Sequence, residues 1–176
     1  CTVLICFTVA SGSVSGAWFD DRAQDLADMG LLKGDGEGFA LGSGVIREEV
    51  AVMIVRLLGK EREALDKNVL SPFPDVSAWA SPYVGYLYEN GLTQGNGDGL
   101  FGASLPCSRQ MYDTFMLRVL GYRDNTDFTF DDASAFAASL GLSSYPQNPD
   151  FRRMDMAAST FLTLLAQPKE GSPLIE

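Results

Sequence analysis

Three arginines recur at the same position of a repeated sequence pattern and are the residues best suited to bind an acidic ligand. Arg47, Arg109 and Arg153 each open a segment that carries apolar residues at helical spacing. The helix dipole opposes a cation in the first turn by ~0.3–1 kcal/mol, so local preference does not account for them. A guanidinium beside the exposed N–H groups of a helix start can bind a carboxylate through paired hydrogen bonds. We therefore expect these arginines to contact an acidic ligand; a salt bridge to one of the chain's own acids is the alternative.

Two tryptophans and two loop glycines complete the candidate site. Trp18 and Trp79 each stand twelve residues before a Gly-Leu pair, and either could stack on a sugar ring. An aromatic residue just before a helix more often packs that helix onto the core, and this role is favoured for both. Gly97 and Gly99 belong to a glycine-rich loop, where we expect tight turns and a close approach of the backbone to a groove.

The composition argues against catalysis, cofactors and metal binding. The chain has 176 residues and no histidine, which removes the usual general base and the commonest zinc ligand. Its 23 acidic residues are scattered, and no carboxylate pair stands out among them. The glycine-rich loops match neither a phosphate-binding loop nor a calcium-binding loop. We expect a protein that is not an enzyme and that needs no cofactor.

Charge and cysteine usage narrow the class of partner. The formal net charge is −10 and the 13 basic residues are dispersed, which argues against a nucleic-acid groove and against unaided attraction to anionic lipid. No apolar run approaches the length of a membrane span. The three cysteines lack metal-ligand spacing and do not define a disulfide framework. We expect Cys107 to be a small buried apolar residue rather than a reactive thiol.

The elements that position these residues follow an internal repeat. Three Gly-Leu pairs each stand ten residues after a helix N-cap candidate. The glycines are Gly30, Gly91 and Gly141, and the cap candidates are Asp20, Ser81 and Asp131. Each segment therefore predicts a short helix of about nine residues that ends at a left-handed glycine cap.

A second helix follows each loop and begins at the repeated arginine. Twelve residues later the first two helices meet Gly59 and Gly121, and the third reaches Leu165 shortly before a proline. The helix starts keep only halves of a capping box; Ser108, for example, has no Glu three residues on. The sequence thus predicts an all-α fold of three helix-loop-helix repeats with about six main helices.

These residues resemble the repeats of S-layer homology domains, which occur in bacterial surface proteins. Such repeats open with Phe-x-Asp-Val and a tryptophan, pass a Gly-Leu turn and a Gly-x-Gly-Phe loop, and continue into an Ile-Thr-Arg-Ala-Glu-like helix start. The best match is the middle repeat, with Phe-Pro-Asp-Val at 73–76, Trp79, the turn at Gly91, Gly-Asp-Gly-Leu-Phe at 97–101 and Cys-Ser-Arg-Gln-Met at 107–111. The first repeat lacks Asp-Val, and the third lacks the tryptophan and the glycine loop.

The resemblance implies a pseudo-threefold arrangement of the repeats with grooves between them. It also implies that the chain anchors an exported protein non-covalently to the bacterial cell wall, by binding an acidic, often pyruvylated, secondary cell-wall polysaccharide attached to peptidoglycan. In related domains the motif arginine meets the acidic sugar. Closeness to the family pattern ranks Arg109 first for binding, then Arg47, then Arg153. An assembly module that engages other surface-layer proteins, without polysaccharide binding, is the competing interpretation.

The repeats divide the chain into five segments. The uncharged residues 1–17 run from apolar to small and polar, which is typical of the remnant of a secretory signal; a strand of an upstream segment is the alternative. Residues 18–70 form the first repeat with a linker, 71–127 the second and 128–168 a degenerate third, and 169–176 form a C-terminal tail or linker. Within the first linker we expect residues 60–70 to continue the preceding helix as a solvated face.

Overall fold

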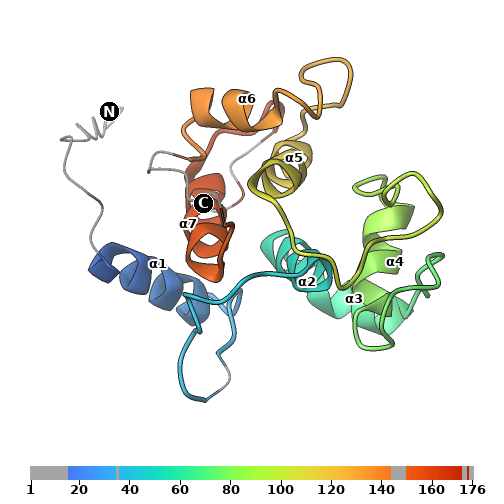
Figure 1. Cartoon of the computed structure of the whole chain (residues 1–176), viewed down its shortest axis with the longest axis horizontal. Helices are drawn as coiled ribbons and strands as arrows, with labels where there is room; N and C mark the ends of the chain where they lie inside the picture. Colours follow the sequence, from blue (N-terminus) through green and yellow to red (C-terminus); the bar gives the residue numbers. More distant parts are fainter. Residues whose placement is uncertain (1–15, 35, 144–149, 172–173, 175–176) are drawn as a thin grey trace.

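The computed structural model describes residues 16–34, 36–143, 150–171 and 174, and throughout this part of the chain the regular elements are α-helices. The all-α prediction is confirmed. The described residues hold seven helices (Figure 1). They are α1 (Gly16–Asp28), α2 (Arg47–Leu57), α3 (Glu61–Lys67), α4 (Ser81–Glu89), α5 (Arg109–Val119), α6 (Ala133–Ser139) and α7 (Arg153–Leu165).

The short helices α1, α4 and α6 end where the Gly-Leu pairs predict. Gly30, Gly91 and Gly141 have φ values of 75°, 69° and 79°, a left-handed conformation that glycine adopts without a Cβ penalty. The leucine after each glycine donates its backbone N–H to a carbonyl in the last helical turn, at 2.8, 2.8 and 3.0 Å respectively. Each glycine also donates its N–H to the carbonyl three residues before it, and the two bonds together form the Schellman motif. A local signal alone therefore accounts for the three helix ends.

The starts of these helices follow the cap signals less closely. The first helix begins at Gly16, so the predicted cap at Asp20 is wrong. Helix α1 packs along α7, and such tertiary packing stabilises helical turns that a local cap signal does not predict. Ser81 is the first residue of α4 rather than its cap, and α6 follows Asp132 rather than Asp131.

The second helices α2, α5 and α7 begin at the three arginines, as predicted. The predicted continuation of α2 through residues 60–70 is wrong. Gly59, with a φ of 66°, turns the chain, and the separate helix α3 follows. Its end is set by Asn68, which is also left-handed. The charged segment therefore adds a helix to the six that the repeat pattern predicts.

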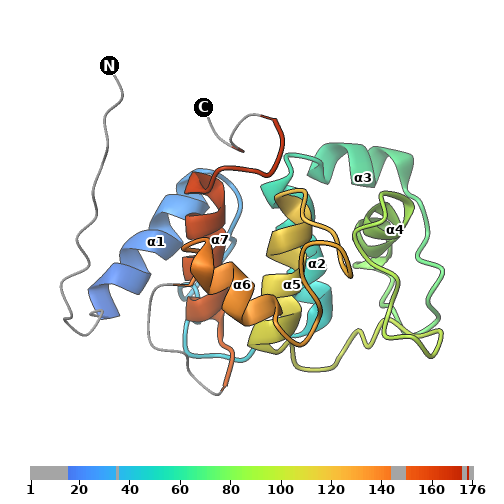
Figure 2. The same cartoon turned by 90° about the horizontal axis from the view of Figure 1, so that it is seen from above.

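The second helices form the centre of the molecule, and the first helices lie around them (Figures 1 and 2). Helix α5 contacts both α2 and α7. Each first helix packs against the second helix of a different predicted repeat: α1 against α7, α4 against α2, and α6 against α5. Helix α3 packs against α4 and α2. Every predicted repeat is thus completed by a helix from another one.

The apolar stripes of the second helices supply the core. Ile54 of α2, Met116 of α5 and Met156 of α7 are all buried. Cys107 is buried as well, which confirms the structural assignment, and burial raises the pKa of its thiol to about 12.

Two predicted segments fall largely outside the described residues. Of the predicted remnant 1–17, only Gly16 and Ala17 are described, and they form the start of α1. Residues 144–149 of the third loop are also outside the described part. At the predicted tail, Lys169 donates its backbone N–H to the Leu120 carbonyl at 2.9 Å, so the tail's first residue packs on the end of α5.

Candidate ligand-binding grooves

The N-termini of α2 and α7 are held by loops from other predicted repeats. The backbone N–H groups of Arg47 and Glu48 donate to carbonyls of residues 105 and 103, both at 3.2 Å. Those of Arg153 and Met154 donate to carbonyls of residues 43 and 41, at 2.9 and 3.0 Å. The expectation that these N–H groups are open to a ligand is therefore wrong: they complete backbone pairing between segments.

Arg47 and Arg153 make the same contact across these two junctions. The Nε of Arg47 donates to the carbonyl of Phe101 at 2.7 Å, and the Nε of Arg153 donates to the carbonyl of Phe39 at 2.9 Å. Phe101 and Phe39 end the two Gly-x-Gly loops, so each arginine fixes the glycine loop that follows another first helix. Arg47 is only 6% exposed, and its guanidinium lies 4.8 Å from the centre of the Phe101 ring. Both arginines thus have a structural role at the junctions.

Arg109 stands in a different environment, dominated by carboxylates. It is 9% exposed and lies 3.6 Å from Asp113 and 3.4 Å from Asp155. Its Nη1 also donates to the Ser159 hydroxyl at 2.5 Å, and its guanidinium lies 4.8 Å from the centre of the Phe151 ring. Because two internal carboxylates already face this cation, an acidic ligand must compete with both.

Burial controls the ionisation of this cluster. Removal from water raises the pKa of Asp113 to about 6, although the charge of Arg109 and the nearby Ser134 of α6 favour its ionised form. Burial likewise raises the pKa of Asp155, against the backbone N–H of Arg152 and the charge of Arg109. Desolvation therefore favours the neutral form of both carboxyl groups, and the charge of Arg109 offsets part of this effect.

The starts of the second helices use one half of a capping box each, as predicted. The backbone N–H of Ile46 donates to Glu49 Oε2 at 3.0 Å, and that of Arg152 donates to Asp155 Oδ2 at 2.8 Å. In α5 the other half is present, since Met111 N–H donates to the Ser108 hydroxyl at 3.2 Å. The same structural task is thus done by a carboxylate in two helices and by a hydroxyl in the third.

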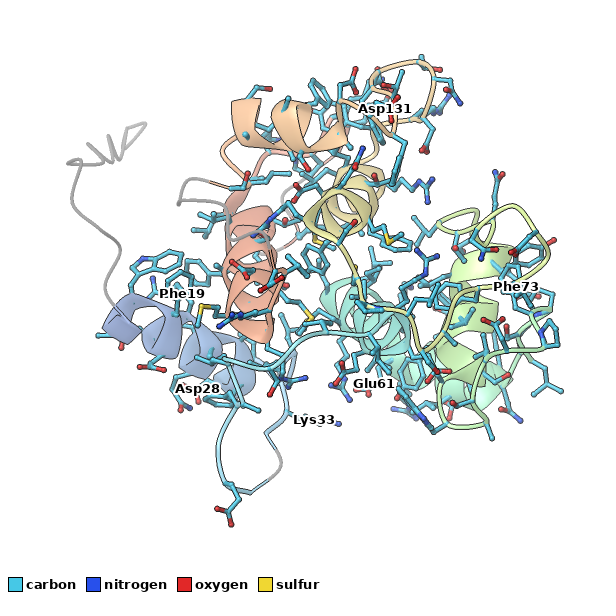
Figure 3. All side chains as sticks on the ribbon, viewed as in Figure 1. Phe19, Asp28, Lys33, Glu61, Phe73 and Asp131 are labelled. Atoms are coloured by element: carbon cyan, nitrogen blue, oxygen red, sulfur yellow. The ribbon has the colours of Figure 1, made fainter. Side chains whose placement is uncertain are left out.

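Cavities lie beside two of the three arginines. Arg153, Lys33 and Glu49 line two cavities of 220 and 350 Å³, which we call the Arg153 groove. Lys33 comes from the loop after α1, and its Nζ lies 3.8 Å from Oε1 of Glu61 of α3. This loop and α3 therefore lie close together beside the groove (Figure 3). Trp79 lines the same groove and is 53% exposed, so the expectation that it packs in the core is wrong.

A separate cavity of 110 Å³ is lined by Arg47, Met111 and Arg118 among others, and we call it the Arg47 groove. Arg118 also lines a neighbouring cavity of 710 Å³ beside the Gly91 turn and Lys169. Burial lowers the pKa of Arg47, the charge of Asp75 opposes this, and the charge of Arg118 adds to it. Two guanidinium groups therefore face one groove.

The remaining candidate residues lie elsewhere. Trp18 is half-buried on α1, edge-on to Phe19 with ring centres 5.1 Å apart. Gly97 and Gly99 have φ values of 94° and 84°, and neither lines the cavities described here. The close approach expected of them belongs to Gly95, where an added Cβ would lie 2.5 Å from the Leu100 carbonyl oxygen.

Sequence reasoning assigned no role to Asp75 or to Arg56 and Arg118. The Asp75 carboxylate accepts backbone N–H groups of Phe101, Gly102 and Ala103 at 2.8, 2.7 and 2.9 Å, and so holds the loop that receives Arg47. Arg56 and Arg118 line the two grooves at corresponding positions, nine residues after Arg47 and Arg109. Two features of the sequence could have identified these residues: the Phe-x-Asp-Val motif for Asp75, and the equal spacing for Arg56 and Arg118.

Comparisons with known proteins agree with part of this description. Residues 72–110, which include α4, the Gly97 loop and Arg109, match the sequence model of the S-layer homology domain. A Thermoanaerobacter kivui protein named "Cell surface protein" is 34% identical over 94 residues, which is 52% of this chain. The aligned part is 12% of that relative's length. In the described residues no helix is both long and apolar enough to cross a membrane. Residues 72–110 are thus similar to an S-layer homology domain, in the segment where the motifs are most complete.

Proposed function

We propose that this chain holds an exported bacterial protein at the cell surface by binding an acidic polysaccharide of the cell wall beside Arg47 and Arg153. The observation that carries the proposal is the equivalence of the two junctions. In each, a motif arginine donates to the last residue of a glycine loop and lines a cavity that a second arginine also lines. A guanidinium is the side chain best matched to a carboxylate, and an exposed tryptophan such as Trp79 offers a face for a sugar ring.

The comparisons support the location at the cell surface. The match of residues 72–110 to the S-layer homology domain points to a surface protein, and the similarity to a protein named "Cell surface protein" points the same way. The chain acts by equilibrium binding, without catalysis or a cofactor. Engagement of several grooves on one polymer raises the overall affinity above that of a single groove. Because the net charge is −10, attraction depends on short-range contacts at the arginines.

The contacts also change the order of importance of the three arginines. We rank Arg47 and Arg153 above Arg109, since Asp113 and Asp155 already face Arg109. Similarity to the family pattern places Arg109 first, but that pattern contains no information on which carboxylates fold against it. The order of affinity losses in the three alanine variants distinguishes the two rankings.

We further infer that the three helix pairs are related by an approximate threefold rotation. The cyclic order of packing, α1 on α7, α4 on α2 and α6 on α5, supports this arrangement. The test is an experimental structure in which each second helix and its partner are superposed on the next pair. Rotations near 120° are expected, and pairs related by translation would overturn the inference.

The experiment that tests the proposed function is co-sedimentation of the whole chain with purified cell-wall sacculi, before and after acid extraction of the attached polysaccharide. We expect binding to intact sacculi and its loss after extraction. Arg153→Gln should weaken binding, whereas Arg62→Gln should leave it unchanged, because Arg62 is an exposed arginine of α3 that lines neither groove. Binding that survives extraction would favour the assembly module instead.

A further inference from the structure

We infer that the residue two positions after each motif arginine sets how strongly the motif arginine of the neighbouring second helix attracts an anion, and that Met111 makes the Arg47 groove a stronger anion site than the Arg153 groove. The inference rests on the proposed function and deepens it, because it ranks the two grooves for the carboxylate of an acidic sugar. The same position carries an acidic residue in α2 and in α7: Glu49 faces Arg153 and makes its groove the weaker anion site, and Asp155 faces Arg109.

Three equivalent contacts join neighbouring second helices. Arg153 Nη1 lies 3.2 Å from Glu49 Oε1, and Arg109 Nη2 lies 3.4 Å from Asp155 Oδ1. Arg47 Nη1 lies 3.4 Å from the sulfur of Met111. Glu49, Met111 and Asp155 each stand two residues after a motif arginine on the facing helix. The geometry is therefore shared, and only the chemistry of the acceptor changes.

The chemistry of the acceptor sets the charge that a ligand meets. A carboxylate occupies the guanidinium and repels an incoming anion, whereas a thioether is an uncharged and weak acceptor. Among the described residues, no ion pair joins Arg47 to a carboxylate, although Arg109 has two ion pairs and Arg153 has one. Arg47 is thus the motif arginine whose charge is least satisfied inside the protein.

The carboxylates of Asp75 and Asp124 near this groove already have hydrogen-bond partners within the protein. The Asp75 oxygens accept three backbone N–H groups. Both oxygens of Asp124 accept hydrogen bonds from Arg118, from Nε and Nη2, each at 2.8 Å. Arg118 and Arg47 line the same 110 Å³ cavity, which Met111 also lines. A ligand carboxylate entering there meets the guanidinium of Arg47, which has no ion pair among the described residues, and that of Arg118, which Asp124 already pairs; the cavity wall itself includes no carboxylate.

The helix start explains how α5 tolerates a methionine here. In α2 and α7 the acidic residue also caps the helix, since it accepts the N–H of Ile46 or Arg152. In α5 the Ser108 hydroxyl caps the helix by accepting the Met111 N–H. Position 111 is therefore released from the capping role, and its side chain is half-buried at the groove.

The test uses the whole chain with a charged and an uncharged substitution of Met111. Met111→Glu and Met111→Gln both complete a capping box with Ser108, so both should fold and they differ chiefly in charge. The probe is a pyruvylated methyl glycoside of an N-acetylhexosamine, titrated by calorimetry, and the same glycoside without the pyruvate is the neutral control. We expect wild type and Met111→Gln to bind the pyruvylated probe within about threefold of each other, and Met111→Glu to bind at least about tenfold more weakly.

The neutral glycoside should bind all three proteins alike. Glu49→Gln, which keeps an acceptor for the Ile46 N–H, should tighten binding of the pyruvylated probe because it removes the carboxylate facing Arg153. Equal affinities of Met111→Glu and Met111→Gln for the charged probe would overturn the inference while sacculus binding by wild type still supported the proposed function. If the wild-type chain binds neither the sacculi nor the charged probe, both the inference and the proposed function are overturned.

Discussion

Asp113 makes the stability of the protein depend on pH in an unusual direction for a carboxylate. Its pKa is raised by burial to about 6, so the folded state holds a proton that the unfolded chain has lost. The stabilising contribution is complete below about pH 4 and is lost as the pH rises through about 6. Asp155, also raised, faces the same Arg109 and acts in the same direction.

Asp113→Asn removes this dependence. The stability of the variant relative to wild type should increase between pH 4 and pH 7, by about 2–3 kcal/mol at most. Urea unfolding of both proteins at several pH values measures the difference. A constant difference across this range would show that Asp113 ionises normally in the folded state.

Asp75 holds the loop on which Arg47 depends. Burial acts to raise the pKa of Asp75, but three backbone N–H groups bind its carboxylate and keep its pKa below the usual value. Asp75→Ala should lower the free energy of unfolding by about 2–3 kcal/mol, since charge-assisted hydrogen bonds are lost together. Asp98→Ala is the control, because Asp98 is exposed and accepts the N–H of Leu100, two residues away, at 3.0 Å. Similar losses in both variants would contradict the role of Asp75.

The sequence predicted which arginines matter but not what they touch. Repetition identified Arg47, Arg109 and Arg153 because equal spacing is visible along the chain. Their partners are 54, 50 and 114 residues away, at Phe101, Ser159 and Phe39. Contacts at such separations depend on which helix packs against which, and no local preference encodes that choice.

The helix ends carry the strongest local information. Gly30, Gly91 and Gly141 are left-handed and an added Cβ would meet nothing within 4 Å, so only backbone strain opposes alanine. Each Gly→Ala variant should lose about 1–2 kcal/mol of stability, by similar amounts. Gly42→Ala, at a position without positive φ and with open space, should change little. Thermal unfolding compares the four variants; widely different losses among the three caps would show that they are not equivalent.

Helix starts and the extra helix were harder to predict for a physical reason. The ends depend on one glycine each, whereas α1 extends back to Gly16 along α7 and α3 forms against α4. The segment just after α3 also lies against α4, so closely that a Cβ added at Gly85 would clash with the Val69 carbonyl oxygen. Tertiary packing of this kind overrides cap signals, and it is invisible in a single segment.

The exchanged packing of first and second helices makes the grooves properties of the whole molecule. Trp79, just before α4, lines the Arg153 groove together with residues of α2 and α7. Trp79→Ala should weaken binding to sacculi about three- to tenfold, as expected for the loss of one stacking face, with little change in stability because the ring is exposed. Leu70→Ala, at an exposed apolar residue outside the groove, is the control. An unchanged affinity in Trp79→Ala would remove the tryptophan from the site.

The central claim is that the arginines at the helix junctions contact an acidic wall polymer. The most direct measurement is the nuclear magnetic resonance spectrum of the arginine Nε–H groups during titration of the whole chain with polysaccharide released from cell walls. We expect shifts at Arg47 and Arg153, smaller shifts at Arg109, whose guanidinium already faces Asp113 and Asp155, and none at Arg62 of α3. Polymer binding that leaves the Arg47 and Arg153 signals unchanged would contradict it.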